Sequence, residues 1–287
     1  MIYLFLCILC ATALNIIFKS VEHYNGDTFH VIIINYICAA GIGFFIAYVS
    51  GPVNLIDYLP LIPVAFFMGA FFILMFYLMA TSVQKAGISA TTVAGRMSVI
   101  LPITFSIIHY HESANTLKII GIILALLSVV LAVYKGKVPK QQKKYVYLPI
   151  IIFFGAGTLD SIIKYVQQEL LTDSLLPFFS AMIFLSALIV GLALILARRK
   201  PVIQTFSPFN LFWGFLLGVS NFGAFYLFVK ALSHSGIESS VVFGINHIGI
   251  VGLSVILALQ LFKEKLNRIN WSGIVLAAIA IFILAKY

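Results

Sequence analysis

Three ionisable residues lie inside long apolar segments of the chain. Arg96, Asp160 and His247 each have uncharged immediate neighbours on both sides. A charge near the centre of a bilayer costs roughly 2.5–3.5 kcal/mol on insertion scales, so such residues are functional candidates by default. The guanidinium of Arg96 has a fixed charge and a planar fork of donors, which suits a carboxylate or phosphate group. The alternative is that Arg96 forms a structural pair with Asp160 or reaches a membrane interface.

Asp160 and Lys164 are four residues apart, which places them on one face of a helix. Asp160 is the only acidic residue well inside a predicted span, so it is the candidate for coupling to protons or other cations. Alternatively, Asp160 and Lys164 neutralise each other. Asn246 and His247 occupy a later apolar segment, and a histidine that titrates near neutral pH suits coupling or substrate binding. A hydrogen-bonded structural role is equally consistent with this pair.

Further polar residues complete the predicted set. Asn15 and Asn221 either line a cavity or join helices by hydrogen bonds, and Lys19 follows Asn15 by one helical turn. Tyr77 and Tyr226 either form the wall of a substrate pocket or pack against neighbours and lipid. Residues two apart point to different sides of a helix, so the histidines in the segment 109–112 (HYHE) do not predict a metal site. No cofactor is predicted.

The composition requires a membrane. Of the 287 residues, 62% are hydrophobic and only 9% are charged, whereas a soluble domain needs roughly a quarter of its residues charged. At roughly 20 residues per span, about ten spans fit and no soluble catalytic domain does. The net charge of +9 comes from basic residues between apolar runs. Those residues predict topology signals and contact with lipid headgroups, and they do not indicate nucleic-acid binding.

Apolar runs bounded by polar residues, proline and glycine predict the membrane helices. The expected ranges are 2–22, 28–50, 59–82, 88–110, 116–134, 147–168, 174–197, 208–231, 237–261 and 269–286. Pro102 is expected to kink the fourth helix. The Gly214-x-x-x-Gly218 spacing predicts a close helix–helix contact. The fold class is therefore an all-α integral membrane protein with about ten transmembrane helices.

The two halves of the chain resemble each other. Tyr77, Gly87 and Gly95 reappear at one offset, and a pair of a glutamate and a glycine nine residues later recurs near the fifth helix of each half: Tyr226, Gly236, Gly244; Glu112–Gly121 and Glu264–Gly273. These matches predict a first five-helix repeat at 1–134, a basic linker at 135–146 and a second five-helix repeat at 147–287. Because each repeat has an odd number of spans, the second is inverted, as in many secondary transporters.

This organisation resembles the EamA-type transporters of the drug/metabolite transporter superfamily. The resemblance covers nearly the whole chain and rests on the tandem five-helix units, a lysine late in the first helix of each unit and the E-x(8)-G signature of the fifth. It implies a central cavity lined by the first, third and fourth helices of each repeat. It also implies a bacterial inner membrane and a small-molecule substrate.

The basic residues predict the orientation. Alternating assignment places on one side Lys19, Lys85, the linker lysines, Arg198, Arg199, Lys200, Lys263, Lys265 and Arg268, and on the other only Lys118, Lys230 and Lys286. Cytoplasmic loops are rich in Lys and Arg, so the linker is expected in the cytoplasm and both termini outside. Ten-helix members of the resembled family usually have both termini inside, and the charge distribution predicts the reverse.

The sequence predicts a non-enzymatic secondary transporter, working as an exporter or exchanger by alternating access. The expected substrate is an amino acid or related organic anion, because the buried basic residues outnumber Asp160, and protons are candidates for coupling. A flippase for a lipid-linked sugar or phosphate is the alternative within this fold. A membrane-embedded lipid-modifying enzyme is disfavoured, since no D-D-x-x-D, H-E-x-x-H or G-x-S-x-G pattern occurs. The protein is expected to be a monomer or homodimer.

Overall fold

The computed structural model of the protein describes residues 2–51, 58–109, 116–134, 145–172, 174–197, 205–234 and 239–286. Within these ranges the regular structure is helical, and no β-strand occurs in them. Eight of the described helices are long and apolar enough to cross a membrane, and two shorter apolar helices accompany them, Ile119–Ala132 and Arg268–Leu284. The predicted all-α membrane fold is confirmed, and the protein is an integral membrane protein.

The helices follow the predicted order with one interruption. Their bounds are α1 (Ile2–His23), α2 (Thr28–Val49), α3 (Leu61–Lys85), α4 (Ile88–Met97), α5 (Ile100–His109), α6 (Thr116–Val133), α8 (Tyr147–Glu169), α9 (Leu176–Ala197), α10 (Pro208–His234), α11 (Ser239–Phe262) and α12 (Arg268–Lys286). Most ends lie within a few residues of the predicted ones. The fourth predicted span is two helices, α4 and α5, with a break at the residues before Pro102.

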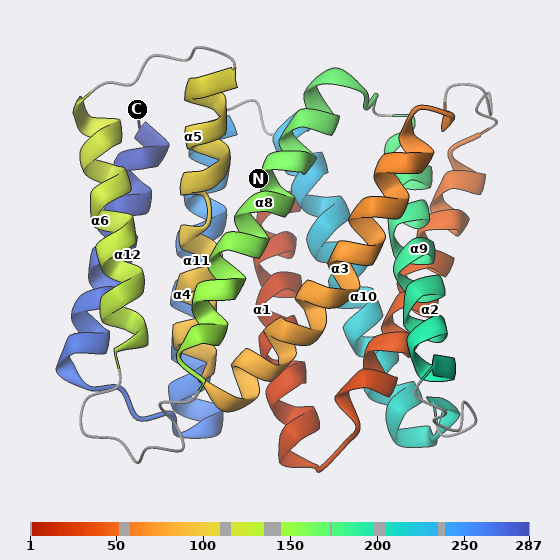
Figure 1. The fold of residues 1–287 in the computed structure, drawn as a ribbon, viewed down its shortest axis with the longest axis horizontal. Coiled ribbons are helices and arrows are strands. Elements are labelled where there is room, and N and C mark those ends of the chain that lie inside the picture. The colour runs from red at the N-terminus through yellow and green to blue at the C-terminus, as the bar shows by residue number, and fades with distance from the viewer. Residues whose placement is uncertain are drawn as a thin grey trace.

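The two halves are arranged as inverted repeats. Helices α1 and α8 run in opposite directions, and so do α6 and α12 (Figure 1). The packing pairs are exchanged between the halves: α1 packs on α10 as α8 packs on α3, and α2 packs on α10 as α9 packs on α3. Equivalent helices also pair directly, because α2 contacts α9, α4 contacts α11 and α6 contacts α12. This exchange is what a two-fold axis in the membrane plane produces.

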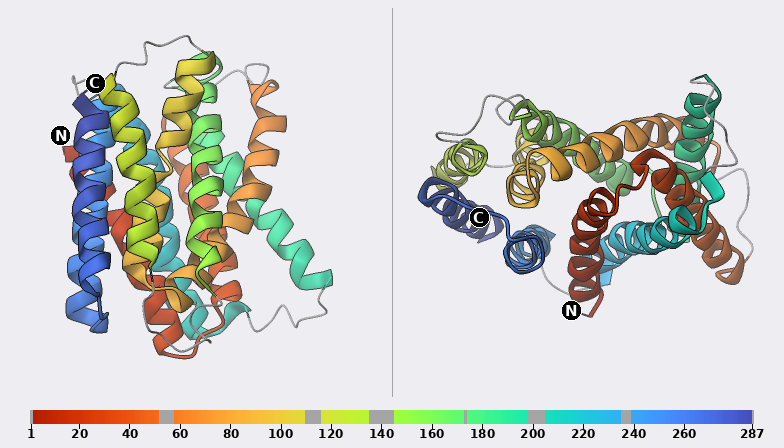
Figure 2. Two further views of the ribbon diagram at one scale, coloured as in Figure 1. Left: turned by 60° about the vertical axis from the view of Figure 1, so that its left-hand side comes forward. Right: turned by 90° about the horizontal axis from the view of Figure 1, so that it is seen from below.

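The hydrophobic cores do not follow the repeats. One buried cluster combines residues of α1, α2 and α3 with residues of α9 and α10. A second combines α4, α5 and α6 with α11 and α12. Seen from below, α6 and α12 lie at one end of the long direction of the molecule and α2 and α9 at the other (Figure 2). Each core therefore needs helices from both halves, and the repeats are held together along their whole length.

Close backbone contacts support this packing. A side chain at Gly214 would meet Ile34, and one at Gly218 would meet Cys38 and the carbonyl oxygen of Asn35. The predicted contact of the Gly214-x-x-x-Gly218 motif is thus confirmed, and its partner is α2. Small residues allow such approach, which makes dispersion contacts and interhelical hydrogen bonds effective in lipid.

The two sides of the fold can be named from the chain itself. The end of α6 and the start of α8 lie at the lower side in Figure 1, and we call this the linker side. Both chain ends lie toward the opposite, terminal side (Figure 2). The linker residues 135–144 lie outside the described residues. A chain with ten membrane spans has both termini on the same side, and the two termini lie on the same side here.

Candidate functional site

Helices α1, α4, α8 and α11 carry a polar cluster in the middle of the fold, where the two cores meet. Its first element is Asn15 of α1, whose amide Nδ2 donates to Thr92 Oγ1 of α4 at 2.9 Å and to Ser254 Oγ of α11 at 3.3 Å. The Asn15 Oδ1 atom is buried and has no hydrogen-bond partner among the described residues. One amide thus joins both repeats and leaves an acceptor for a further group.

Arg96 and Asp160 bring opposite charges into this cluster from different repeats. Arg96 lies in the last turn of α4 and Asp160 lies in α8. The charge of each acts on the other, yet no ion pair within 4.0 Å joins these two described side chains. Ser98 Oγ lies 3.5 Å from Asp160 Oδ2. The two opposite charges therefore influence each other without a direct ion pair.

Both charged side chains keep accessible surface. Arg96 and Asp160 are surrounded by protein, but each is only half-buried, whereas the adjacent Met97 and Leu159 are buried. Both side chains therefore keep part of their surface accessible, unlike these two neighbours.

Cys7, Asn246 and His247 extend the cluster toward the terminal side. Cys7 Sγ of α1 donates to Asn246 Oδ1 of α11 at 3.4 Å and to Ala224 O of α10 at 3.3 Å. His247 is 3% exposed, and the charge of Arg96 acts on both His247 and Cys7. Sequence reasoning did not select Cys7. The signal was its eight-residue spacing from Asn15, which places both residues on one face of α1.

The break between α4 and α5 positions Arg96 at a helix end. Pro102 has no backbone N–H, and its ring disfavours a helical carbonyl four residues earlier, at Ser98. The structure accordingly leaves the helix at Ser98 and Val99, where Val99 N donates to Arg96 O at 3.4 Å. Ser98 Oγ donates to Gly95 O at 2.6 Å and satisfies one of the freed carbonyls. The kink predicted from Pro102 is confirmed.

The lysines of the predicted site lie in different surroundings. Lys164 is half-buried one turn beyond Asp160 in α8. Lys19 lies near the linker-side end of α1, where its Nζ pairs with Glu22 Oε2 at 2.8 Å and donates to Gln84 O at 3.0 Å. Lys85 Nζ pairs with the other Glu22 oxygen at 3.0 Å. The contacts of Lys19 therefore hold α1 to α3 and do not join it to the central cluster.

Asn221 and the two tyrosines lie on the third helices of the two repeats, Tyr77 on α3 and the others on α10. Asn221 lies in the α2–α10 contact, where its Nδ2 donates to Asn35 Oδ1 at 3.1 Å. Tyr226 stacks on Phe222, with ring centroids 5.3 Å apart, and Lys230 Nζ lies 5.9 Å from its ring centroid. Tyr77 is 38% exposed and packs edge-on against Phe29. The equivalent tyrosines thus differ in their contacts.

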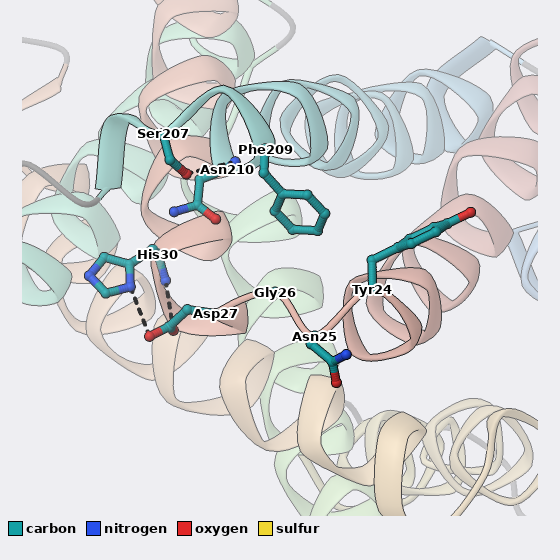
Figure 3. Close-up of a pocket in the computed structure, with 8 residues that line it drawn as sticks. All are labelled: Tyr24, Asn25, Gly26, Asp27, His30, Ser207, Phe209 and Asn210. Carbon is teal, nitrogen blue, oxygen red and sulfur yellow. Dashed lines mark hydrogen bonds and ion pairs between the residues drawn. The ribbon is translucent and has the colours of Figure 1, made fainter.

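A separate polar pocket lies at the linker-side turn between α1 and α2 (Figure 3). It has a volume of about 340 Å³ and is lined by Tyr24, Asn25, Gly26, Asp27, His30, Ser207, Phe209 and Asn210. Asp27 caps α2 by accepting from Phe29 N at 3.0 Å, and its second oxygen lies 2.9 Å from His30 Nδ1. These contacts are those of a helix N-cap, so they explain Asp27 and His30 without a ligand.

Among the described residues, no group of three or more His, Cys, Asp or Glu side chains is placed to hold a metal ion. His109, the first residue of the segment 109–112 (HYHE), ends α5. His111 and Glu112 of that segment lie outside the described residues.

The chain is similar to known proteins in sequence and in fold. Residues 1–134 match the EamA-like transporter family. An uncharacterized protein of Haemophilus influenzae is 27% identical over 290 residues, covering 98% of this chain and 96% of that protein. A protein of known crystal structure aligns with a TM-score of 0.62 at 14% identity, over 98% of this chain and 94% of its own. At that identity the structural match shows a shared fold.

Proposed function

We propose that the protein is a secondary transporter of a small polar metabolite, because residues 1–134 match the EamA-like transporter family. It exports or exchanges its substrate by alternating access, with the binding site at the interface of the two repeats. We propose a bacterial inner membrane as its location, with the linker in the cytoplasm, since the basic residues of the described chain concentrate on the linker side.

The arrangement of Arg96 and Asp160 carries the proposal for the substrate. The two opposite charges come from different repeats, act on each other and do not form a direct ion pair. An amino acid has a carboxylate for the guanidinium and an ammonium group for the aspartate, so it satisfies both. A related organic anion would pair with Arg96 alone. Because the charges sit on α4 and α8, such a substrate would bridge the repeats, as alternating access requires.

The neighbouring residues have proposed roles of their own. Asn15 offers a buried, unpaired carbonyl oxygen to a donor on the substrate. Asn246 and His247 form the wall on the α11 side, and Tyr226 on α10 limits the size of the substrate. Asp160 is the proposed proton-coupling group. When its carboxylate binds a proton, it loses the negative charge that interacts with Arg96. Lys164 lies one turn away and would respond to that change.

The first test is ligand-dependent thermal stability of the purified protein. A ligand that binds only the folded state raises the apparent stability by mass action, by about 2.7 kcal/mol at one hundred times its Kd. The panel contains amino acids, organic acids, nucleotide sugars, polyprenyl phosphates and cationic drugs. We expect a shift with amino acids or organic anions that disappears in Arg96→Ala and weakens in Asp160→Asn. Counterflow of the responding compound in proteoliposomes then establishes transport.

Matched variants make this test selective. Lys265→Ala removes an exposed basic residue on the linker side, and Glu169→Gln removes an exposed carboxylate at the end of α8. Both should keep the full ligand response. A response to polyprenyl phosphate alone would contradict the proposal and favour a flippase for a lipid-linked substrate. A protein that shows no saturable flux with any compound class would refute transport by this chain.

A further inference from the structure

The linker-side end of α4 is held by a carboxylate from the other repeat. Glu264 follows α11 in a turn where Lys263 has a positive φ of 51° and Glu264 N donates to Ala258 O at 3.1 Å. Glu264 Oε2 accepts from Ser89 N at 3.3 Å and from Ser89 Oγ at 3.1 Å. The residue at the N-cap position of α4 is Gly87, which makes no side-chain capping bond. Glu264 thus supplies from the second repeat the acceptor that the first repeat lacks.

Gly87 and Glu264 depend on each other sterically. Gly87 has a φ of 110°, a conformation that other residues rarely adopt, and a Cβ placed on it would overlap Glu264 Oε1. A larger residue would therefore both strain the turn and displace the carboxylate. The negative charge also lies at the N-terminal end of α4, where the helix dipole favours it. The conformation of Gly87, the hydrogen bonds to Ser89 and the helix dipole all favour the Glu264 carboxylate at the N-terminal end of α4.

The helix that Glu264 holds is the one that carries Arg96. Helix α4 has only 10 residues and ends just after Arg96, at the break before Pro102. A rise of about 1.5 Å per residue separates Ser89 from Arg96 by about 10 Å along the axis. Glu264 therefore does not touch the proposed substrate site. Because a helix of this length moves as a rigid body, fixing its first turn sets the height and direction of its last turn.

Other polar contacts on the linker side have different partners. The bonds of Lys19, Glu22 and Lys85 join helices of the first repeat to one another. Asn270 of α12 donates to the carbonyl oxygens of Leu131 and Ala132, which joins the peripheral α6–α12 pair. Glu264 differs because it connects the end of α11, which carries Asn246 and His247, to α4. Opening of the central site toward the linker side requires α4 and α11 to part there.

We infer that Glu264 is a positioning residue for Arg96 and the latch between the repeats on the linker side. This inference rests on the proposed alternating-access function. With the bonds to Ser89 intact, α4 stays against α11 and the site is closed toward the linker. When they break, the first turn of α4 loses its bond to the second repeat, while Thr91 and Thr92 keep their bonds to Ser82 and Asn15, and the site opens to that side. The strength of this contact therefore sets the ratio of the two states.

The test measures the accessibility of α4 directly and needs no substrate. In a background where Cys7, Cys10 and Cys38 are replaced by serine, the buried Ala90 of α4 is changed to cysteine (Ala90→Cys) as a reporter. A membrane-impermeant maleimide is added to vesicles of known orientation, from one side at a time. Hydrogen bonds to a charged group are worth enough to change a two-state ratio about tenfold or more. We expect Glu264→Ala to raise labelling from the linker side by about that factor and to lower it from the terminal side.

Companion variants separate a latch from general loss of structure. Ser89→Ala removes one of the two bonds and should have a smaller effect, and the double variant should not exceed Glu264→Ala, because both act through one contact. Glu264→Gln keeps an acceptor oxygen and tests the same bond if Glu264→Ala is not recovered. Glu169→Gln is the matched carboxylate control and should leave both labelling rates unchanged.

The outcomes distinguish this inference from the proposed function. Unchanged labelling in Glu264→Ala, or a rise from both sides together, overturns the latch even if the protein transports. A side-specific shift in a protein that gives no flux supports the latch and contradicts transport. A latch also predicts that Glu264→Ala changes the ratio of exchange to net transport for any substrate found, which simple destabilisation does not.

Discussion

The fourth helix of each repeat contributes to the central cluster, but the two helices are built differently. In the first repeat it is broken into α4 and α5 at Ser98 and Val99, whereas its counterpart α11 runs unbroken from Ser239 to Phe262. The first contains Pro102, and at the same offset that relates Tyr77 to Tyr226 the second has Val251. No proline occurs in 239–262. The proline in the first repeat and its absence from the second account for the break in one helix and the continuity of the other.

The difference has consequences for how each helix presents its polar groups. Arg96 lies at the end of a short helix, so its position depends on what holds the other end, and this includes Glu264 of the second repeat. Asn246 and His247 project from the middle of a long helix, whose backbone is fixed by its own hydrogen bonds. The comparison teaches that symmetry of the fold does not imply equal mobility of the two halves of the site.

The largest effect is expected from giving α11 the break that α4–α5 already has. Val251→Pro removes a backbone hydrogen bond inside α11 at a residue that is 3% exposed. Proline in a helix interior costs about 3 kcal/mol or more. Chemical unfolding in detergent should show that loss, and Val251→Ala, which keeps the N–H, should lose less. Equal stability of the proline variant would mean that continuity of α11 is not what distinguishes it from α4.

Removing Arg96, the charged residue on the broken helix, should have the next largest effect. Arg96→Ala should weaken binding of an anionic substrate about ten- to hundredfold, because hydrogen bonds to charged groups contribute about 1.5–3 kcal/mol. Asn246→Ala on the continuous helix should cost about fivefold, since it removes a neutral partner. Substrate KM in proteoliposome counterflow measures both. Arg96→Lys keeps the charge without the planar fork and should fall between them. A larger loss in Asn246→Ala would place the main contact on α11.

Closing the break in α4–α5 should have a moderate effect. Pro102→Ala restores a backbone N–H that can donate to Ser98 O and allows a continuous helix, in which Val99 N would donate to Gly95 O in place of its long bond to Arg96 O. One such bond contributes about 1 kcal/mol, and amide hydrogen exchange there should slow about fivefold. Hydrogen-exchange mass spectrometry of the 95–105 peptide reads this directly. Unchanged exchange would show that packing, and not the proline, maintains the break.

The smallest effect is expected from the serine at the break. Ser98→Ala removes the Oγ bond to Gly95 O and the contact with Asp160. The loss of about 0.5–1.5 kcal/mol should lower the melting temperature by roughly 1–5 °C, with little change in flux. Ser254→Ala on α11 removes a partner of Asn15 and is the matched substitution. A loss of transport in Ser98→Ala without loss of stability would give Ser98 a direct role in the site.

The membrane helices and their inverted order were predictable because lipid imposes a simple rule. A segment that crosses hydrocarbon must be apolar and helical, and both properties are visible in short stretches of sequence. The break in the fourth helix followed for the same reason, since the effect of Pro102 is local. The candidacy of Arg96 and Asp160 also came from local context, because an ionisable residue inside an apolar run is unusual wherever the helix finally lies.

Which polar residues meet was not predictable in the same way. Asn15 and Lys19 are one turn apart in α1, yet Asn15 bonds to α4 and α11 while Lys19 bonds to Glu22 and Gln84. Glu264 looked like part of a repeat signature, and its contact with Ser89 spans 175 residues. Such contacts depend on the angle and height at which helices pack, which many side chains determine together.

The sequence by itself determined that this protein is a helical membrane protein of inverted repeats, because hydropathy, proline and motif order act over a few residues or recur along the chain. Only the tertiary structure decided that each core is shared between the repeats, that Arg96 faces Asp160 without pairing directly, and that Glu264 caps a helix of the opposite half. These are relations between surfaces far apart in sequence. They follow from the close packing of many side chains at once, and no single segment of the sequence contains enough information to predict them.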